Sequence, residues 1–252
     1  MWKKIRVSIL LLILAWVAFS TWQDMNQDWN KSVIVLLHPI NADGDPVTAK
    51  YIEQISIENL DQTQHFLAEN SRQFRGQAIF FDFQLGRTLT ELPPKVPVSN
   101  SMLDNILWSL KFRYYAWKQH QSADGSPDVT LYLNFYNPQK TNVLKHSVAL
   151  QRGRIGIVNL FAAEKYRGSN QVVATHELLH AFGATDKYDM LSGQPIYPLG
   201  YAEPDRKPLY PQSMAEIMGG YIPLSENKSV TPKSLQDTMM SPTTAQEIGW
   251  MK

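Results

Sequence analysis

The chain has 252 residues, of which 44% are hydrophobic and 19% charged, and its 24 basic and 23 acidic side chains leave a formal charge of +1. A chain of this size and composition can bury an apolar core, and its balanced charge disfavours a nucleic acid as partner. It contains no cysteine. Disulfides, thiolate zinc sites and cysteine nucleophiles are therefore excluded, and any metal must be held by His, Asp or Glu.

The first 22 residues have the pattern of an export signal. Two lysines and an arginine precede an apolar run over 7–19, which places the chain that follows outside the cytoplasm. The small-x-small sequence at 18–20 fits a cleaved signal peptide, whereas extension of the run through residue 22 makes an uncleaved membrane anchor tolerable. Both alternatives stay open. A buried core helix would need polar residues at helical spacing, which the run lacks. Residues 23–31 are interpreted as a polar linker.

From residue 32 onward, the hydrophobic pattern predicts helices and strands in a single domain of α/β or α+β type. Apolar residues at helical spacing predict two long helices, over 46–72 and 99–120, and the aromatic residues of the second helix are assigned to the core. Four segments are predicted to be strands; the first ends at His38 and Pro39, and the later ones are expected to be antiparallel. These segments are 33–37, 78–85, 129–136 and 155–161.

The character of the sequence changes near residue 184. Eight of the fifteen prolines lie beyond residue 186, and within this part only 243–250 has helical character. We therefore expect an upper lobe that extends to about residue 183 and a loop-rich lower lobe over 184–252.

Residues 176–180 read HELLH, which is the HExxH pattern of zinc hydrolases. On a helix, His176 and His180 lie about 40° apart, so both imidazoles can reach one zinc ion while apolar residues gather on the opposite side. Glu177 can act on a water molecule bound to that ion without being a ligand. The pattern predicts a catalytic zinc site.

The motif extends to HExxHxxGxxD, because Gly183 and Asp186 follow the second histidine. Glycine can end the helix in the left-handed conformation, after which the chain turns back beneath the metal. With these residues the sequence resembles the metzincin clan of zinc peptidases, whose motif HExxHxxGxxH is followed by a methionine turn. The resemblance extends over 170–250. It implies Asp186 as the third zinc ligand, in place of the usual histidine.

Other carboxylates compete for the position of third ligand. Asp189, Glu203 and Glu216 lie in the same lobe, and zinc peptidases of the thermolysin type take a glutamate from a later helix. Asp186 is favoured because the segment between 187 and 215 is too rich in proline to form such a helix.

The resemblance also implies a fold and an activity. The fold is α+β and zincin-like, with an α/β-like upper lobe, a twisted mixed sheet and an active-site helix. The activity is zinc-dependent hydrolysis of peptide bonds, in which Glu177 takes a proton from zinc-bound water and passes it to the departing amine. The substrate would extend an edge strand, for which 153–158 is the candidate. Met218 is the candidate for the turn methionine, and Met240 is its rival.

Several tyrosines are candidates for stabilising the transition state. In several metzincins this tyrosine lies two residues after the turn methionine, whereas Tyr221 lies three residues after Met218. Tyr188, Tyr197 and Tyr201 are other phenols in the same lobe, and none of the four is favoured by spacing.

Two other functions stay open from the sequence. A membrane-tethered binding protein could keep the zincin fold without turnover, although Glu177 would then have no purpose. A zinc amidase could act on a non-peptide amide such as cell-wall material. The expected partners are a peptide or protein substrate and, if the N-terminal segment is uncleaved, a membrane. The expected location is extracytoplasmic, either periplasmic or at the cell surface.

Overall fold

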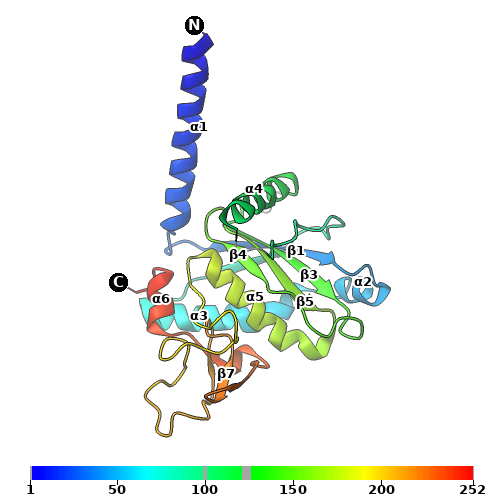
Figure 1. Cartoon of the computed structure of the whole chain (residues 1–252), viewed down its shortest axis with the longest axis vertical. Coiled ribbons are helices and arrows are strands. Elements are labelled where there is room, and N and C mark those ends of the chain that lie inside the picture. The colour runs from blue at the N-terminus through cyan, green and yellow to red at the C-terminus, as the bar shows by residue number, and fades with distance from the viewer. Residues whose placement is uncertain (1, 99–100, 121–125, 252) are drawn as a thin grey trace.

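A five-stranded twisted sheet forms the centre of the folded domain, and α1 (Trp2–Met25) projects away from it (Figure 1). The computed structural model describes residues 2–98, 101–120 and 126–251, so positions 99–100 of the second predicted helix lie outside the described residues. The strand order is β2-β1-β3-β5-β4; the first four strands are parallel, and β4 is antiparallel to β5. The strands are β1 (Val33–Asn41), β2 (Phe81–Leu85), β3 (Val129–Tyr136), β4 (Val148–Leu150) and β5 (Ile155–Phe161).

The structure confirms a mixed α and β fold, but the expected series of antiparallel strands is wrong. β3 and β5 form as predicted and pair in parallel with each other. Among the described strands of this sheet only β4 is antiparallel, because the turn at 151–154 reverses the chain directly into β5. β5 consequently lies inside the sheet and β4 forms its edge. The choice of 153–158 as the edge strand for substrate is therefore wrong.

The expected end of the first strand at His38 and Pro39 is also wrong, because β1 continues beyond both residues. Proline lacks an N–H group and is tolerated in a strand where no neighbouring strand needs that donor. β2 pairs with β1 only as far as Leu85, opposite Leu37. Beyond that point Pro39 faces a loop, and its carbonyl accepts a hydrogen bond from Leu89 N (3.0 Å).

Helices cover both faces of the sheet, and each face has its own apolar core (Figure 1). α3 and α5 pack on one face, where Leu67 and Leu178 are buried together with Leu131 of β3. α4 packs on the other face, where the ring of Phe112 contacts that of Tyr132. Leu131 and Tyr132 point to opposite faces because side chains alternate along a strand. The helices are α3 (Asp61–Arg75), α4 (Met102–Lys118) and α5 (Arg167–Ala181).

The first predicted helix, over 46–72, is broken into two helices. The apolar positions Ile55, Leu60 and Phe66 are five and six residues apart, and these intervals do not keep to one face of a single helix. A short 3₁₀ turn therefore separates α2 from α3. The elements are α2 (Pro46–Ile52) and the 3₁₀ turn η1 (Ile57–Leu60).

The second predicted helix forms as α4, but its aromatic residues do not all enter the core. Trp108, Phe112 and Tyr115 are buried against the sheet, as expected. Tyr114 and Trp117 were also expected in the core and are instead 64% and 73% exposed. Helical periodicity identifies apolar faces, but it does not say whether the rest of the chain covers each of them.

α1 is a continuous helix of 24 residues that is long and apolar enough to cross a membrane. Its apolar stretch is not buried inside the structure, so the alternative of a core helix is wrong. The segment that follows α1 is attached to the domain. Trp29 is buried, and its Nε1 donates a hydrogen bond to Ile248 O (3.0 Å).

The chain beyond residue 184 forms short elements that are joined by long loops. It contains two small two-stranded sheets, β6 with β9 and β7 with β8, and ends in a short helix close to its predicted position. Its elements are β6 (Ala215–Glu216), β7 (Ile222–Ser225), β8 (Lys228–Val230), the 3₁₀ turn η3 (Leu235–Asp237), β9 (Thr238–Met239) and α6 (Pro242–Glu247). One further 3₁₀ turn, η2 (Glu164–Tyr166), lies in the upper lobe directly before α5.

Candidate metal centre

α5 carries the HExxH residues near its C-terminal end, and its packing decides which way they face. Leu178 and Leu179 are almost completely buried in the core beneath the helix. The side chains of His176 and His180, one helical turn apart, are 10% and 16% exposed and lie within contact distance of the loop that follows. The helix thus has a core side and a ligand side, which is the division expected from the sequence.

The chain reverses its direction directly after α5. Gly183 has a φ of 107°, which residues with a side chain rarely adopt, and a Cβ at this position would also collide with the side chain of Gln151. Ala184 N then donates to Leu179 O (3.1 Å). The reversal brings Asp186 to both histidines.

Three side-chain atoms form a nearly equilateral triangle. Nε2 of His176 and Nε2 of His180 are 3.0 Å apart, and each lies 3.1 Å from Oδ1 of Asp186. On a tetrahedral zinc ion with bonds of about 2.0–2.1 Å, neighbouring ligand atoms are about 3.3 Å apart. The triangle therefore fits such an ion with little movement, and two imidazoles with one carboxylate are a donor set found in catalytic zinc sites.

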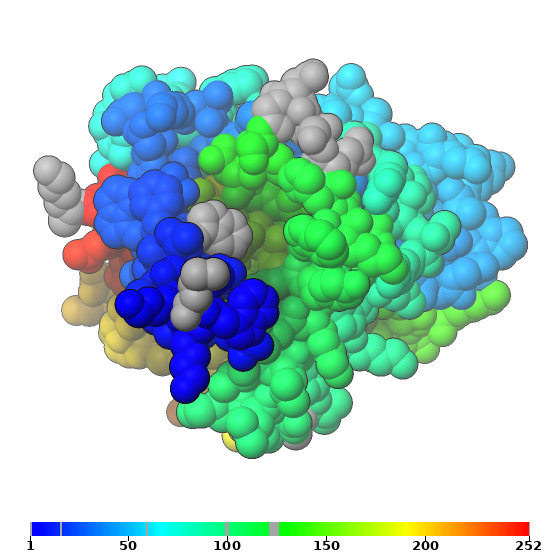
Figure 2. All heavy atoms as spheres, turned by 90° about the horizontal axis from the view of Figure 1, so that it is seen from above, coloured from blue at the N-terminus to red at the C-terminus, as the bar shows by residue number. Residues whose placement is uncertain are grey.

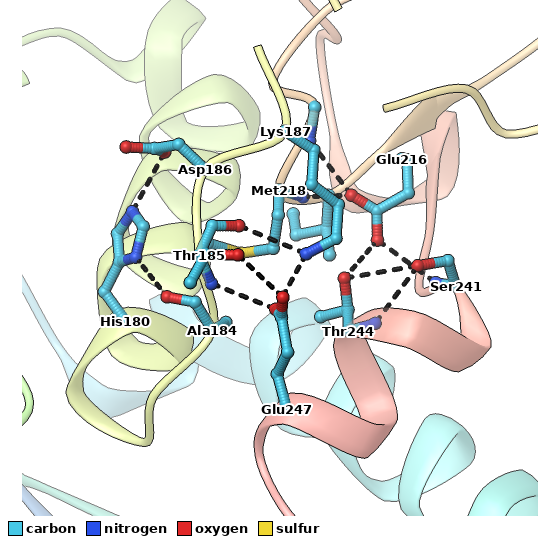
Figure 3. A network of polar contacts seen from close by, with 12 residues as sticks. His180, Ala184, Thr185, Asp186, Lys187, Glu216, Met218, Ser241, Thr244 and Glu247 are labelled. Carbon is cyan, nitrogen blue, oxygen red and sulfur yellow. Dashed lines mark hydrogen bonds and ion pairs between the residues drawn. The ribbon is translucent and has the colours of Figure 1, made fainter. Parts of the chain in front are cut away.

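Backbone carbonyl groups fix the orientation of both imidazole rings. Nδ1 of His176 donates to Ile217 O (2.9 Å), and Nδ1 of His180 donates to Ala184 O (2.7 Å; Figure 3). A carbonyl oxygen only accepts hydrogen bonds, so each neutral ring carries its proton on Nδ1 and keeps a lone pair on Nε2, facing Asp186. Metal-ligating histidines are held in this way.

The electrostatics of the triangle favour an ionised Asp186. Burial opposes its ionisation, but the hydrogen bonds with His176 and His180 outweigh burial and hold the pKa of Asp186 well below its ordinary value of 3.8. Burial also opposes a charged His176, yet its contact with Asp186 and the nearby Glu177 raise the pKa of His176 above 6.5. The centre thus attracts positive charge, whether a proton or a metal ion.

Glu177 is buried beside the triangle, and its Oε2 has no hydrogen-bond partner among the described residues. Burial raises the pKa of Glu177, although positive charge on His176 and His180 opposes this rise. A buried carboxylate oxygen without a donor is costly unless water or a ligand satisfies it. Glu177 therefore has the free acceptor that a general base needs.

A tight turn at 216–219 supports the ring of His176. Glu216 is fully buried, and its Oε2 accepts hydrogen bonds from Met218 N (2.6 Å) and Gly219 N (2.9 Å). Because Ile217 lies within this turn, its carbonyl is held where Nδ1 of His176 can reach it. The orientation of His176, a candidate ligand from the upper lobe, thus depends on a carboxylate in the lower lobe.

Of the two candidate turn methionines, Met218 lies within this turn. Its side chain is fully buried, and its carbonyl accepts a hydrogen bond from Lys187 N (2.9 Å), the residue after Asp186. Met240 is also buried, but it follows β9, the strand that pairs with β6 immediately before the turn. Met240 therefore borders the turn and does not form it.

An ion pair holds the loop that carries Asp186. Nζ of Lys187, which is 3% exposed, lies 2.8 Å from Oε2 of Glu247 in α6, and Thr185 donates to the same carboxylate from N (3.0 Å) and Oγ1 (2.6 Å; Figure 3). Burial opposes the ionisation of Glu247, but Lys187 and Thr185 lower its pKa. Sequence reasoning missed this network. The predicted C-terminal helix was its only signal, and no local spacing links Glu247 to Asp186.

The candidate tyrosines fall into two groups. The ring of Tyr188 lies 6.2 Å from that of His176, so Tyr188 borders the triangle, and the ring of Tyr221 lies 6.3 Å from that of Tyr188. Burial and the nearby Asp186 and Glu177 raise the pKa of Tyr188. Tyr197 and Tyr201 instead pack against each other, with ring centroids 5.4 Å apart.

The other carboxylates considered for the third ligand position form hydrogen bonds with groups outside the triangle. Asp189 accepts hydrogen bonds from the backbone of its own turn, including Ser192 N (2.7 Å). Glu203 accepts from Ser213 N (3.0 Å), and Glu216 closes the turn described above. Among the described acidic residues, Asp186 is the one grouped with both histidines.

No family model matches the chain, and no curated protein matches its sequence. The interpretation of the site therefore depends on its residues and their geometry.

Proposed function

We propose that the protein is a zinc metallopeptidase of the metzincin type, in which His176, His180 and Asp186 hold the metal. The observation that carries this proposal is the convergence of two inward-facing Nε2 atoms and one carboxylate oxygen within 3.1 Å of one another. Two further features support it: the turn containing Met218 beside His176, and the active-site helix packed on a sheet with an antiparallel edge strand.

Zinc held by these side chains would supply a Lewis acid that polarises the scissile carbonyl and makes water more acidic. Glu177 would act first as a general base and then as a general acid. Its unpaired Oε2 and raised pKa suit a group that accepts a proton from the attacking water and later gives it to the departing amine. The water oxygen bonds to the carbonyl carbon, the C–N bond breaks, and the products are a carboxylate and an amine.

The substrate would lie along β4, which is the edge strand of the sheet that packs against α5. An extended peptide can add to such an edge through backbone hydrogen bonds, so sequence preference would come from side-chain pockets. This position replaces the one expected from the sequence, since 153–158 lies largely within β5, between two other strands.

We also propose that the domain lies outside the cytoplasm, because α1 combines a basic N-terminal segment with an apolar span. Protease added to spheroplasts should then digest the domain. Digestion only after lysis would contradict this topology.

The function is tested by incubating the full-length protein with casein and, separately, with purified cell wall. Each reaction is run as isolated, with chelator, and with zinc restored after chelation. Cleavage of casein that chelator stops and zinc restores is the expected result. Release of cell-wall fragments alone would support the amidase. Stoichiometric zinc without cleavage of either material would support the binding protein.

The ligand assignment is tested separately, by metal content and by the coordination distances in a zinc-bound structure. Asp186→Ala should lose most of its zinc, and in the wild type a carboxylate oxygen of Asp186 should lie about 2.0–2.2 Å from the metal. An Asp186 several ångströms away, with Glu203 or Glu216 in its place, would contradict the metzincin assignment.

A further inference from the structure

α4 has an apolar face that nothing in the described part of the chain covers. Its outward residues recur at intervals of three and four, so they form one stripe along the helix. Leu103 and Leu110 in this stripe are 71% and 57% exposed, whereas Phe112 on the opposite side is buried against the sheet. The α4 stripe consists of Leu103, Ile106, Leu107, Leu110, Tyr114 and Trp117.

Three of the four charged side chains of α4 are basic, and they border the stripe. At 100° per residue, Lys111 and Lys118 lie along one side of it and Arg113 along the other. Lys118 also pairs with Glu91 (2.7 Å). Helices with Leu and Trp on one face and basic residues beside it lie in the membrane interface, where the basic groups meet anionic lipid headgroups.

α1 leaves the domain on the side that α4 covers. Figure 1 shows α1 rising from that side of the sheet, and Figure 2, in which α1 points toward the viewer, shows both helices on one face. A membrane crossed by α1 would therefore face the outward side of α4.

Contacts at one turn fix both helices to the domain. Arg154, in the turn between β4 and β5, donates to the C-terminal carbonyls of Gln23 (3.2 Å) and Asp24 (2.8 Å) in α1. Gly153 N donates to Oδ2 of Asp24 (2.7 Å), and Arg113 of α4 binds the same turn. A cation at the C-terminal end of a helix also matches the helix dipole. α1 is therefore held at a defined angle to α4.

We propose that the α4 stripe lies in the interfacial region of the membrane that α1 crosses, in the leaflet on the domain's side. The domain would then be held at two points. A second copy of the chain is the other candidate to cover the stripe; the shared face with α1 and the basic border favour the lipid surface. The inference requires that α1 remains as an anchor, and it does not depend on peptidase activity.

This orientation has a consequence for the proposed function. α5 and the metal centre lie on the face of the sheet opposite α4. The site would therefore open away from the bilayer, and its substrates would be polypeptides in the aqueous compartment and not segments within the membrane.

The test uses full-length protein in vesicles of phosphatidylethanolamine and phosphatidylglycerol. Because the chain has no cysteine, single-cysteine variants can each carry one fluorophore at a chosen position. Leu110→Cys reports on the stripe, Leu12→Cys on α1, and Leu191→Cys, a position 98% exposed in the lower lobe, serves as the aqueous control. Brominated lipids should quench the fluorophores at 12 and 110 several-fold more than the one at 191.

A second comparison asks whether the stripe itself makes the contact. In the Leu110→Cys background, Leu103→Gln with Trp117→Gln should reduce quenching at 110 several-fold. Val143→Gln with Leu191→Gln changes two apolar residues elsewhere that are even more exposed, and it should leave quenching unchanged. Because all four positions are exposed, zinc content should be the same in both variants.

Three outcomes would overturn the inference. The first is quenching at 12 without quenching at 110, and the second is crosslinking of the stripe to a second copy in vesicles. The third is a mature protein that lacks α1 by mass spectrometry. None of them bears on casein cleavage, so failure of this inference and failure of the peptidase proposal are distinguishable.

Discussion

The two lobes share one apolar core, to which the lower lobe contributes Ile217, Met218 and Met240, but they differ in what fixes the segments around the metal centre. In the upper lobe, α5 rests on a continuous apolar core in which Leu67, Leu131 and Leu178 are almost completely buried. In the lower lobe, the segments near the metal centre are joined by Glu216 and Glu247, whose carboxylates bind backbone and side-chain donors (Figure 3). The histidines therefore come from a packed scaffold, whereas the third candidate ligand comes from a loop that polar contacts hold in place.

This difference follows from the composition of the lower lobe. Its prolines and long loops leave many backbone N–H groups without a helix or sheet partner, and such groups must be satisfied when they are buried. A carboxylate can accept several of them at once. Glu216 accepts from Met218 N, Gly219 N, Ser241 N and the hydroxyl of Thr244.

The largest expected effect comes from Glu177, the proposed base in the upper lobe. Glu177→Gln removes the proton acceptor and leaves the triangle intact, so hydrolysis should fall by about 10²–10⁴-fold. Zinc content and thermal stability should change little. Activity on casein and metal content by mass spectrometry check this together, and turnover close to that of the wild type would show that Glu177 is not the base.

A pair of variants compares the forces that hold the two lobes. Leu67→Ala leaves a cavity in the upper core, on the core side of α5, and should cost about 2–5 kcal/mol of unfolding free energy. Glu216→Ala leaves several buried donors without an acceptor and should cost about 3 kcal/mol or more. Urea unfolding measures both costs.

The two variants should differ in their affinity for zinc. Glu216→Ala loosens the turn that orients His176, so it should weaken zinc binding in the folded protein, whereas Leu67→Ala should not. Equal zinc affinity in the two variants would contradict the dependence of the ligands on the lower-lobe turn.

A smaller effect on zinc affinity is expected from breaking the ion pair between Lys187 and Glu247. Glu247→Gln removes the charge that holds Lys187 and Thr185, and a change in a group that supports a ligand typically costs about 10–100-fold in metal affinity. Glu203→Gln is the matched control, because the carboxylate of Glu203 binds Ser213 and Arg206 and none of the three triangle residues. Zinc titration against a competing indicator should separate the two, and similar losses in both would argue against a specific role for Glu247.

The sequence predicted the features that depend on local spacing. One helical turn separates His176 from His180, and Gly183 ends the helix three residues later, so the chain reversal that brings Asp186 back was foreseeable. The positions of β1, β3 and β5 were predicted because buried apolar runs mark them, but the later strands were wrongly expected to be antiparallel.

The features that the sequence did not reveal depend on distant contacts. Glu247 and Glu216 look like ordinary acidic residues until folding places them beside Lys187 and Met218. β4 has three half-buried residues and so lacks a clear pattern. The aromatic residues of α4 were assigned to the core because periodicity shows an apolar face without showing what covers it, and Trp117 proved to be exposed.

The pH dependence of zinc binding should separate the candidate ligands of the two lobes. Burial opposes ionisation of Asp186 and protonation of His176, but their mutual contact dominates, so the pKa of Asp186 lies below 3.8 and that of His176 above 6.5. Asp186 therefore stays ionised near neutral pH, and protons compete with zinc at His176. Zinc affinity should fall as pH falls from 8 to 6, by up to about tenfold per pH unit for each proton displaced.

The stability of the metal-free protein should respond to pH in the opposite direction. The raised pKa of His176 contributes stability that is fully present below 6.5, its ordinary value, and is lost as pH rises through the higher folded-state value. Melting temperatures in chelator should therefore decrease from pH 6.5 to 8, while those in excess zinc should increase. A gain of stability in chelator over the same range would contradict a raised pKa of His176.

Asp186→His sharpens the comparison. It places in the lower lobe a side chain that must also lose a proton to bind zinc, so the variant should show a steeper pH dependence of zinc binding.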